Sequence, residues 1–416
     1  MKVYVEVYGC TANKGDASLI KGVIKKSNHK LVDNIEDADA SIILTCTVID
    51  TTEQRMLYRL KKLRDSGKKV VVAGCMASVQ SDKIKAIIPE ASLLPPKYSH
   101  HIVDILDNKK ISFIEKNKTV FPKHFDDIFA PISISEGCMF SCTYCITSIA
   151  RGKLKSYPIS EISRDVCIAL RNGCKETQLT SQDTSSYGFD LNTDLGNLLR
   201  EISSVKSDFK VRVGMMNPYT CLKNLDSILD GFDDSKIYKF VHLPVQSGDD
   251  YILEKMNRKY SVDDFIKIVK VFRDKYPEIT IATDVIVGFP SETEDQFQNT
   301  IDLLKNIKPD ITNITRFSAR PFTKAKDLKG RIKTEIVKER SRKLTEMCSN
   351  ISKENNKKHI RKKYIVLVTE KGKNNTHVGR SDNYKPVVIK NKVDIGEFIP
   401  VEIIKAESTY LVGSII

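Results

Sequence analysis

Apolar and polar positions change their period along the chain and mark out three regions. In the first 125 residues, short apolar runs predict four strands, at 1–8, 40–45, 69–73 and 92–94. Residues 52–66 predict an amphipathic helix, because one face carries Met56, Leu57, Leu60 and Leu63. Strands that alternate with helices in this way predict a doubly wound parallel sheet, which ends near residue 125.

A second series of strand-like runs follows, each pair separated by enough chain for a helix. The runs lie at 132–135, 176–180, 210–214, 239–243, 280–287 and 311–316. Residues 160–172 and 261–276 are examples of the helical stretches between them. Six βα units predict an open, partial (βα)6 barrel. In such barrels the reactive groups lie at the carboxyl ends of the strands and in the loops that follow.

The last region has a different pattern of apolar and polar residues. A charged helix is predicted over 334–358, followed by short β-branched runs at 364–369, 384–389 and 401–404. Gly, Asn and Pro separate these runs, which is typical of a small β-barrel of about sixty residues, a fold often used to hold RNA. We therefore predict an α/β multidomain chain with domains at 1–125, 126–356 and 357–416.

Length and charge refine this picture. A chain of 416 residues suggests two to four domains. The formal net charge is +14. Most of it lies after residue 330, a segment that contains 19 Lys and Arg but only 10 Asp and Glu. A basic terminal module attracts nucleic acid phosphates, although a single basic run is often only solvated surface. The RNA-binding candidates are Lys357, Lys358, Arg361, Lys362 and Lys363.

The cellular setting limits what the ten cysteines can do. No apolar run is long enough to span a membrane, and the first ten residues lack the apolar stretch of a signal peptide. We therefore expect a cytoplasmic protein without a membrane partner. Because disulfide frameworks are rare in that compartment, the cysteines indicate metal, cluster or redox chemistry instead.

Three cysteines form one compact motif directly after the first strand of the predicted barrel. Cys138, Cys142 and Cys145 have the spacing C-x3-C-x2-C. Three thiolates can hold three corners of a [4Fe–4S] cluster and leave the fourth iron open. A structural zinc site normally has four ligands, and no fourth Cys or His is nearby. The motif therefore favours a cluster.

This motif resembles that of the radical S-adenosylmethionine (SAM) enzymes. In that family the open iron binds the amino and carboxylate groups of SAM, and one electron cleaves SAM to give a 5′-deoxyadenosyl radical. The aromatic Tyr144, directly before the third cysteine, also fits the family, where this position packs on the adenine of SAM. An electron donor such as ferredoxin or flavodoxin is then expected.

Cys10, Cys46 and Cys75 form a second, dispersed set. Each follows an apolar strand run of the first region. The carboxyl ends of parallel strands share one edge of a sheet, so the three thiols are expected to converge there. Spacing alone leaves two interpretations open, a second cluster or three ordinary core cysteines, because free cysteine is a common buried residue.

The sequence around this second set resembles the methylthiotransferases, which are radical SAM enzymes. The resemblance lies in residues 9–13, 45–48, 52–56 and 72–77, and later in 179–188, 242–248, 256–258 and 284–290. It implies a flavodoxin-like N-terminal domain with a second [4Fe–4S] cluster on Cys10, Cys46 and Cys75. It also implies a C-terminal TRAM barrel that binds RNA.

Polar residues after the predicted barrel strands are the candidates to hold SAM. Gln182 and Asp183 follow the second strand, Gln246 and Ser247 the fourth, and Gly288 the fifth. Each could instead make an ordinary loop hydrogen bond, but as a set they favour a ligand site, and a glycine lets the backbone approach a ligand closely. The other four cysteines are interpreted as structural: Cys167, Cys174, Cys221 and Cys348.

The resemblance implies a reaction that uses SAM twice in each turnover. One SAM supplies a methyl group to sulfur on the N-terminal cluster, and the other is cleaved to the radical that removes hydrogen from the target carbon. Acid–base catalysis would be inadequate at an unactivated C–H bond, which explains the need for radical chemistry. The carbon radical then takes up the methylthio group.

The branches of this family differ in substrate. The sequence Thr-Glu-Gln-Arg-Met at 52–56 and Cys46-Thr47-Val48 most resemble the branch that modifies threonylcarbamoyladenosine beside the tRNA anticodon. A base in the anticodon loop is splayed out and therefore accessible to an enzyme. Gln-Asp-Thr at 182–184 disfavours the isopentenyladenosine branch but is shared with the branch that modifies an aspartate of a ribosomal protein. That branch remains an alternative, as does an RNA-binding module with vestigial SAM cleavage.

One loop departs from the family pattern. After the sixth strand the family usually reads Arg-Pro-Gly-Thr-Pro-Ala, whereas this chain has Arg-Pro-Phe-Thr-Lys-Ala at 320–325. Phe322 and Lys324 replace a glycine and a proline, so the conformation and contacts of this loop are expected to differ.

Overall fold

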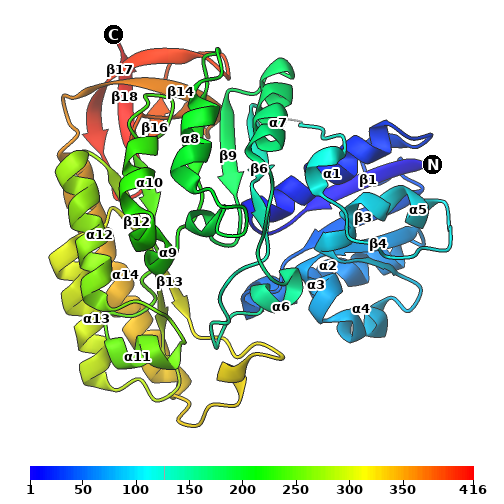
Figure 1. The fold of residues 1–416 in the computed structure, drawn as a ribbon, viewed down its shortest axis with the longest axis horizontal. Helices are drawn as coiled ribbons and strands as arrows, with labels where there is room; N and C mark the ends of the chain where they lie inside the picture. The colour runs from blue at the N-terminus through cyan, green and yellow to red at the C-terminus, as the bar shows by residue number, and fades with distance from the viewer. Residues whose placement is uncertain (126) are drawn as a thin grey trace. The chain divides into compact units, whose positions relative to one another are not determined.

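The computed structural model describes residues 1–125 and 127–416, and its contacts divide the chain into two compact units. Unit 1 consists of residues 1–172, 178–182 and 318–326, and unit 2 holds 173–177, 183–317 and 327–416. Strand β9 (Glu176–Thr180) passes from one unit to the other. Figure 1 shows the course of the chain from the N-terminus to the C-terminus.

A five-stranded parallel sheet begins unit 1. Its strand order is β2-β1-β3-β4-β5, with strands at Lys2–Val7 (β1), Lys30–Val32 (β2), Ala40–Thr45 (β3), Lys69–Gly74 (β4) and Ser92–Leu94 (β5). Helices accompany them at Thr11–Lys25 (α1), Asp50–Asp65 (α2), Cys75–Val79 (α3), Ser81–Ile87 (α4) and Ile102–Leu106 (α5). The predicted doubly wound sheet is therefore confirmed.

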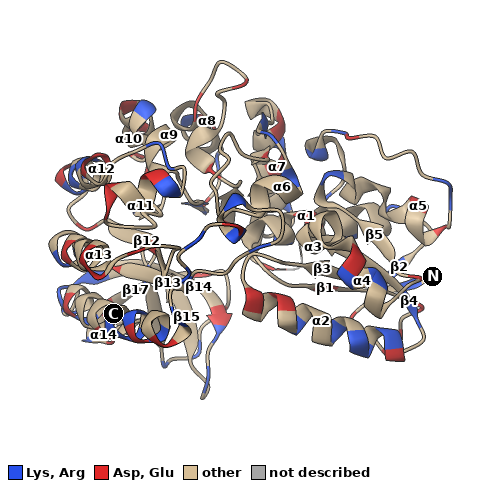
Figure 2. Ribbon diagram, turned by 90° about the horizontal axis from the view of Figure 1, so that it is seen from below, with Lys and Arg blue, Asp and Glu red and all other residues tan. Residues whose placement is uncertain are grey.

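Alternation along the buried strands supplies both faces of this sheet with a core. Ile42 and Leu44 of β3 pack with α1 and α5 on one face, while Ile43 packs with α2 and α4 on the other. Strand β3 is buried at every position, and its central residues Ile42, Ile43 and Leu44 are apolar, as burial on both faces requires. Helix α2 places acidic residues in its first turn and basic ones in its last, which complements its dipole (Figure 2).

The first strands of the barrel also lie in unit 1. Strand β6 (Phe129–Ser133) pairs beside β9, and the cysteine motif follows it. Strands β7 (Ser135–Glu136) and β8 (Lys155–Ser156) form a short antiparallel ladder around the motif. Helices α6 (Thr147–Arg151) and α7 (Ile159–Arg171) complete this part.

The remaining barrel strands belong to unit 2. They are β10 (Lys210–Val213), β11 (Phe240–His242), β12 (Thr280–Val287) and β13 (Ile311–Arg316). Hydrogen bonding groups the six strands into two sheets, β10-β9-β6 and β11-β12-β13. Only isolated bridges link the two sheets in the described residues, Val211 with Ile237 and Met215 with His242, so the barrel is open and interrupted.

Helices of unit 2 follow the strands as the βα pattern predicts. They lie at Leu195–Ser203 (α8), Pro218–Lys223 (α9), Leu225–Gly231 (α10), Asp250–Lys255 (α11), Val262–Lys275 (α12) and Glu294–Ile307 (α13). Capping boxes begin the two longest of these six, with Ser261 and Asp264 at α12 and Thr293 and Gln296 at α13. Helix α14 (Thr334–Lys357) leads to the C-terminal barrel and carries mixed charges (Figure 2).

The C-terminal segment is a closed five-stranded barrel within unit 2. Its order is β14-β15-β16-β18-β17, with strands at Lys363–Lys371 (β14), His377–Arg380 (β15), Pro386–Ile389 (β16), Phe398–Ala406 (β17) and Leu411–Ile415 (β18). Polar contacts tie it to the rest of the unit. Lys385 donates to Asp310 at 2.8 Å, and the hydroxyl of Tyr384 donates to Glu176 at 3.2 Å.

The pattern of the sequence misses four short strands of the described chain. Strands β2, β8, β15 and β18 have few consecutive apolar residues, and their pairing partners stabilise them. In the part of the chain that the structure describes, no helix has the length and hydropathy needed to cross a bilayer.

Candidate active site

The dispersed cysteines lie where parallel strands end. Cys10 follows β1, Cys46 follows β3 and Cys75 follows β4, three adjacent strands of the sheet. Two glycines let the strand ends approach one another. Gly9 has φ +99°, and a Cβ there would lie 2.8 Å from the Cβ of Cys46, while a Cβ on Gly74 would meet the carbonyl oxygen of Thr45 at 2.6 Å.

The three thiols form one electrostatic group. Burial raises the pKa of Cys75 to about 11, and the neighbouring Cys10 and Cys46 add to this shift. Burial likewise raises the pKa of Cys46, again with a contribution from Cys10. Cys10 is exposed and the other two are buried. The structure thus brings together the three residues that the sequence predicted to converge.

The second cysteine motif is a tight loop between β7 and α6. The amide of Cys138 donates to Gly152 O at 3.0 Å, and that of Cys145 donates to Cys142 O at 3.0 Å. Gly137 has φ +75°, and a Cβ there would lie 2.0 Å from Lys153 O, so only glycine fits before Cys138. All three cysteines and Tyr144 are partly exposed.

Two short helices of unit 1 bring the cysteine sets near each other. Cys75 and Val79 of α3 pack against Ile146 and Ala150 of α6 in one small apolar cluster. Cys75 belongs to the dispersed set, and Ile146 directly follows Cys145 of the compact motif. The packing of α3 on α6 therefore makes the two thiol sets neighbours.

A buried network of four ions, Asp16, Lys118, Glu136 and Arg151, connects α1 with β7 and α6 on either side of the compact motif. Arg151 donates to Glu136 at 2.7 Å and to Asp16 at 2.8 Å, and Lys118 bonds both carboxylates. Burial opposes ionisation of Glu136, but Arg151 and Lys118 outweigh it and lower the pKa of Glu136 to about 2. Glu136 lies two residues before Cys138, so the network positions the start of the compact motif.

Arg151 also connects this network with the dispersed cysteines. Its guanidinium donates to Asn13 Oδ1 at 2.9 Å, and Asn13 in turn donates to Thr45 O at 2.9 Å, directly before Cys46. Arg151 lowers the pKa of Cys75 by charge and hydrogen bonding, against the larger effect of burial. Its Nε is buried and has no partner among the described residues.

A second buried arginine approaches from the loop at 320–325. Arg320 donates to Thr47 Oγ1 at 2.9 Å and forms an ion pair with Glu53, which Lys83 and Gln80 also contact. Burial lowers the pKa of Arg320, while Asp50 and Cys46 act in the opposite sense. Its Nε is also buried without a partner in the described chain.

These surroundings fit an anionic cluster on the dispersed cysteines. Two buried guanidinium groups with spare Nε–H donors stand near thiols that must be deprotonated to bind iron. Among the described residues, no three His, Cys, Asp or Glu side chains meet closely enough to hold a single metal ion. A cluster differs in this respect, because each thiolate binds a separate iron.

The predicted SAM-binding residues have varied environments. In unit 1, Gln182 has a buried Oε1 with no hydrogen-bond partner among the described residues, which fits a donor group of a ligand. In unit 2, Gln246 is buried and has φ +72°, a strained value for a residue with a side chain. Ser247 is fully buried, and its hydroxyl accepts from Asp249 N at 3.2 Å.

Asp183 and Gly288 make internal contacts in unit 2. The carboxylate of Asp183 accepts hydrogen bonds from Thr220 Oγ1 at 2.7 Å and from the hydroxyl of Ser185 at 2.8 Å. Gly288 has φ +78°, and a Cβ there would lie 2.5 Å from the side chain of Val337. The close approach at Gly288 is therefore to helix α14, and its role toward SAM remains a prediction.

Sequence reasoning gave no partners for several residues that the structure brings together. Arg151, Glu136 and Arg320 are examples, and their partners are distant in the sequence. In unit 2, His242 Nε2 lies 2.8 Å from Asp284 Oδ1, which also accepts from Asn313 Nδ2 at 2.8 Å. These three residues belong to β11, β12 and β13, so only the pairing of strands unites them.

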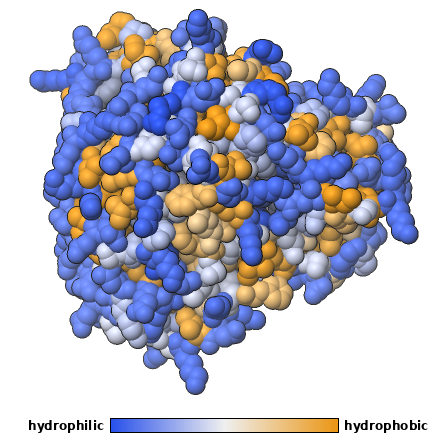
Figure 3. Space-filling model, in the orientation of Figure 1, coloured by the Kyte–Doolittle hydropathy of each residue, from blue (hydrophilic) through white to orange (hydrophobic). Residues whose placement is uncertain are grey.

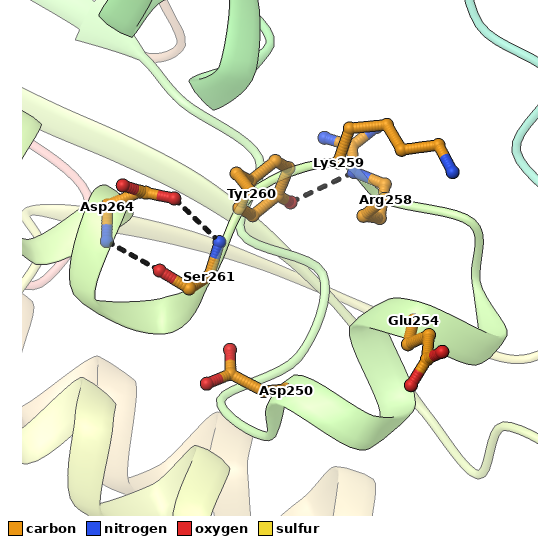
Figure 4. Close-up of a pocket in the computed structure, with 7 residues that line it drawn as sticks. All are labelled: Asp250, Glu254, Arg258, Lys259, Tyr260, Ser261 and Asp264. Atoms are coloured by element: carbon orange, nitrogen blue, oxygen red, sulfur yellow. Dashed lines mark hydrogen bonds between the residues drawn. The ribbon is translucent and has the colours of Figure 1, made fainter.

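The surface of unit 2 has a hollow of about 360 Å³ beside α11 and α12. It is lined by Asp250, Glu254, Arg258, Lys259, Tyr260, Ser261 and Asp264 (Figure 4). Arg258 Nε donates to the hydroxyl of Tyr260 at 2.9 Å, and Ser261 and Asp264 form the cap of α12. These contacts stabilise the loop and helix, and we assign the hollow no chemistry.

The predicted RNA-binding residues surround the junction of α14 and β14. Lys357, Lys358, Arg361 and Lys363 are exposed. Lys362 differs, because its Nζ lies 2.5 Å from Glu278 Oε1, so part of its charge is already compensated. His359, in the middle of the run, is buried and does not contribute to the exposed basic surface.

The open barrel and its three-cysteine loop define a radical SAM enzyme. The Radical SAM superfamily model matches residues 132–304, the uncharacterized protein family UPF0004 model matches 2–95, and the TRAM domain model matches 357–416. The chain belongs to the family of threonylcarbamoyladenosine tRNA methylthiotransferases, as its curated relatives show.

Two relatives illustrate this membership. The chain is 42% identical to a probable threonylcarbamoyladenosine tRNA methylthiotransferase of Archaeoglobus fulgidus, over 100% of this chain and 99% of that protein. It is 31% identical to the Homo sapiens threonylcarbamoyladenosine tRNA methylthiotransferase, over 99% of this chain and 73% of that one. The family that the sequence resembled is therefore confirmed.

Solved structures support the fold. A radical S-adenosylmethionine methyltransferase, TsrM, from Kitasatospora setae is 13% identical and superposes with a TM-score of 0.58, covering 78% of this chain and 76% of that one. The cobalamin-dependent radical enzyme OxsB superposes with a TM-score of 0.54 over 84% of this chain and 56% of that one. At these identities the likeness concerns the fold alone.

Proposed function

We propose that this protein methylthiolates C2 of N6-threonylcarbamoyladenosine at position 37 of tRNA, giving 2-methylthio-N6-threonylcarbamoyladenosine. The observation that carries the proposal is the similarity to threonylcarbamoyladenosine tRNA methylthiotransferases over the whole chain. The neighbouring cysteine sets of unit 1 support it. Modification of a ribosomal protein and a module with vestigial SAM cleavage are not favoured by these relatives.

The residue roles follow from the site. Cys138, Cys142 and Cys145 would hold the cluster that cleaves SAM, and Cys10, Cys46 and Cys75 the one that carries sulfur. Together with SAM, the bound clusters would supply the radical that removes hydrogen and the methylthio group that replaces it. The chain itself positions the two thiol sets through Arg151, and Gln182, Gln246 and Ser247 would contact SAM. From the family resemblance, Tyr144, Asp183 and Gly288 are further candidates for contact with SAM.

We further propose the boundaries, partners and setting of the enzyme. The domains are 1–125, 126–356 and 357–416, and the ranges of the three family models support this division. A cytoplasmic reductant such as ferredoxin or flavodoxin would supply the electrons, because the reductive cleavage of SAM consumes one electron for each radical. The RNA partner is the anticodon stem-loop that carries the threonylcarbamoyl group.

Mass analysis of tRNA nucleosides tests the function directly. Cells without this gene should lose 2-methylthio-N6-threonylcarbamoyladenosine and accumulate the precursor that lacks the methylthio group. Restoring the gene should restore the product, whereas a copy with Cys138→Ala should not. An unchanged nucleoside profile in the deletion strain would exclude the proposed substrate.

The basic run at the start of the C-terminal barrel should contribute to tRNA affinity. Changing Lys357, Lys358, Arg361, Lys362 and Lys363 to glutamine should weaken binding and flatten its salt dependence. Each lost phosphate contact changes the logarithmic slope by about 0.9 at most in duplex regions. Lys362 should contribute least, because Glu278 already contacts it. Measurement of RNA affinity at several salt concentrations provides the slope.

A lysine that is paired on a helix surface serves as the control. Lys270 lies on α12 and forms a 2.8 Å ion pair with Asp274. Its change to glutamine should leave the slope as it is in the unmodified protein. A slope that is equally unchanged in the five-residue variant would mean that the run is solvated surface without RNA contacts.

A further inference from the structure

The loop at 320–325 displays an unusual side chain. Phe322 is 72% exposed, more than any other large hydrophobic residue in the part of the chain that the structure describes. Hydrophilic side chains cover most of the protein face seen in Figure 3. An aromatic ring held in water adds little to the stability of the fold, because burial of apolar surface is what stabilises it.

The backbone at Phe322 makes the residue still less favourable for folding. Its φ is +62°, in the left-handed region that a side chain disfavours and glycine tolerates. The family pattern usually has glycine at this position. Phe322 therefore combines a strained backbone conformation with an exposed ring, and such strain is typical of functional sites.

The loop is anchored at both ends to the two cysteine regions of unit 1. At one end, Arg320 is buried and bonds Thr47, which directly follows Cys46. At the other end, the amide of Ala325 donates to Thr143 O at 2.8 Å, within the compact cysteine motif. Ala325 is fully buried, and Thr323 closes the turn by donating to Arg320 O at 2.8 Å.

These anchors give Phe322 a defined position. The ring lies on a short loop whose ends contact the segment after Cys46 and the segment between Cys142 and Cys145. A substrate nucleoside must approach both thiol sets to receive a methylthio group. The ring is thus held at the surface of unit 1 beside the groups that would react.

The chemistry of the loop matches single-stranded RNA. Aromatic side chains stack on unpaired bases, and nearby cations bind the phosphates between them. Lys324 is exposed two residues after Phe322. Both departures from the family pattern, an aromatic ring for glycine and a cation for proline, therefore add groups of the kinds that bind single-stranded RNA.

We propose that Phe322 stacks on an unpaired base of the tRNA anticodon loop while Lys324 binds the adjoining phosphate. The inference rests on the proposed function, since it takes tRNA as the substrate. It adds a base-stacking site at this loop, which the usual glycine and proline of the family would not provide. Stacking would hold the anticodon loop open beside the reactive groups.

The absence of tryptophan from the sequence allows a direct test. Phe322→Trp creates a protein whose only tryptophan occupies the proposed stacking position. We expect its fluorescence to be quenched when an anticodon stem-loop RNA with threonylcarbamoyladenosine is added to the full-length reconstituted protein. The same RNA with abasic residues in the loop should bind through its stem but give no quenching.

A matched tryptophan elsewhere provides the control. Tyr58 is 61% exposed on helix α2 of the same unit, so Tyr58→Trp places a comparable reporter outside the loop. Its emission should not change with RNA. Equal quenching in both variants, or no quenching at Phe322→Trp while a labelled RNA is shown to bind, would overturn the stacking proposal and leave the proposed function standing.

A direct measurement of RNA binding distinguishes a failure of this inference from a failure of the proposed function. If labelled stem-loop fails to bind the unmodified protein by anisotropy, the proposed function fails together with the inference. If RNA leaves the emission of Phe322→Trp unchanged but an added protein changes it, the loop is a protein-docking site and the inference is wrong.

Phe322→Gly distinguishes a binding role from a structural one. Loss of one stacked base weakens affinity about 5- to 150-fold. Glycine relieves the backbone strain, so the melting temperature should stay the same or rise. Phe322→Tyr should retain affinity, because its ring also stacks. A variant that loses thermal stability but keeps RNA affinity would show that the ring is structural.

Discussion

Cys10→Ala should remove about half of the iron from anaerobically reconstituted protein while SAM cleavage continues. The unmodified protein should carry about eight irons, four for each set of three cysteines. Cys10 belongs to the dispersed set at the ends of β1, β3 and β4, so its loss leaves the compact motif intact. Iron analysis and the yield of 5′-deoxyadenosine measure the two effects separately.

Two further variants make this result specific. Cys138→Ala should remove the other half of the iron and abolish 5′-deoxyadenosine formation. Cys167→Ala should change neither, because Cys167 lies on α7 outside both sets. Four irons in both the unmodified protein and Cys10→Ala would contradict the presence of a second cluster.

Glu136→Gln should destabilise the protein strongly even without any cluster. Glu136 is buried between Arg151 and Lys118, so neutralising it leaves two buried cations with only Asp16 as a carboxylate partner. Removing one member of a buried ion pair lowers the free energy of unfolding by about 3–5 kcal/mol. Denaturant unfolding of the cluster-free protein measures this loss. An exposed pair offers the comparison, since Asp274→Asn should have no measurable effect.

The pH dependence of this difference has a defined sign. The folded pKa of Glu136 is lowered to about 2, below an ordinary value of about 4.3. Its contribution to stability is therefore complete above pH 4.3 and is lost as the pH falls toward 2. We expect the stability of the unmodified protein to approach that of Glu136→Gln over this interval. A gap that stays constant with pH would mean that Glu136 stabilises through packing and not through charge.

Local pattern predicted most of the fold. The strands at 40–45 and 280–287 were predicted at the bounds observed, because buried parallel strands are rich in apolar and β-branched residues. Strands β2, β8, β15 and β18 were not predicted, because pairing with their neighbours, and not their own sequence, stabilises them. The division of the six barrel strands into two sheets could not be predicted either, because the sequence pattern does not show which strands are hydrogen-bonded to each other.

The sequence by itself determined the chemistry of this protein. Two sets of three cysteines and a basic terminal module identify the reactive groups and the kind of partner, since thiolate spacing and charge are properties of residue type. Only the tertiary structure decided how these groups are held. Arg151 meets Asp16 and Asn13 across more than 130 positions of sequence, and Arg320 reaches Glu53 across 267. Such contacts depend on packing, because a buried arginine and an exposed one look alike in a sequence.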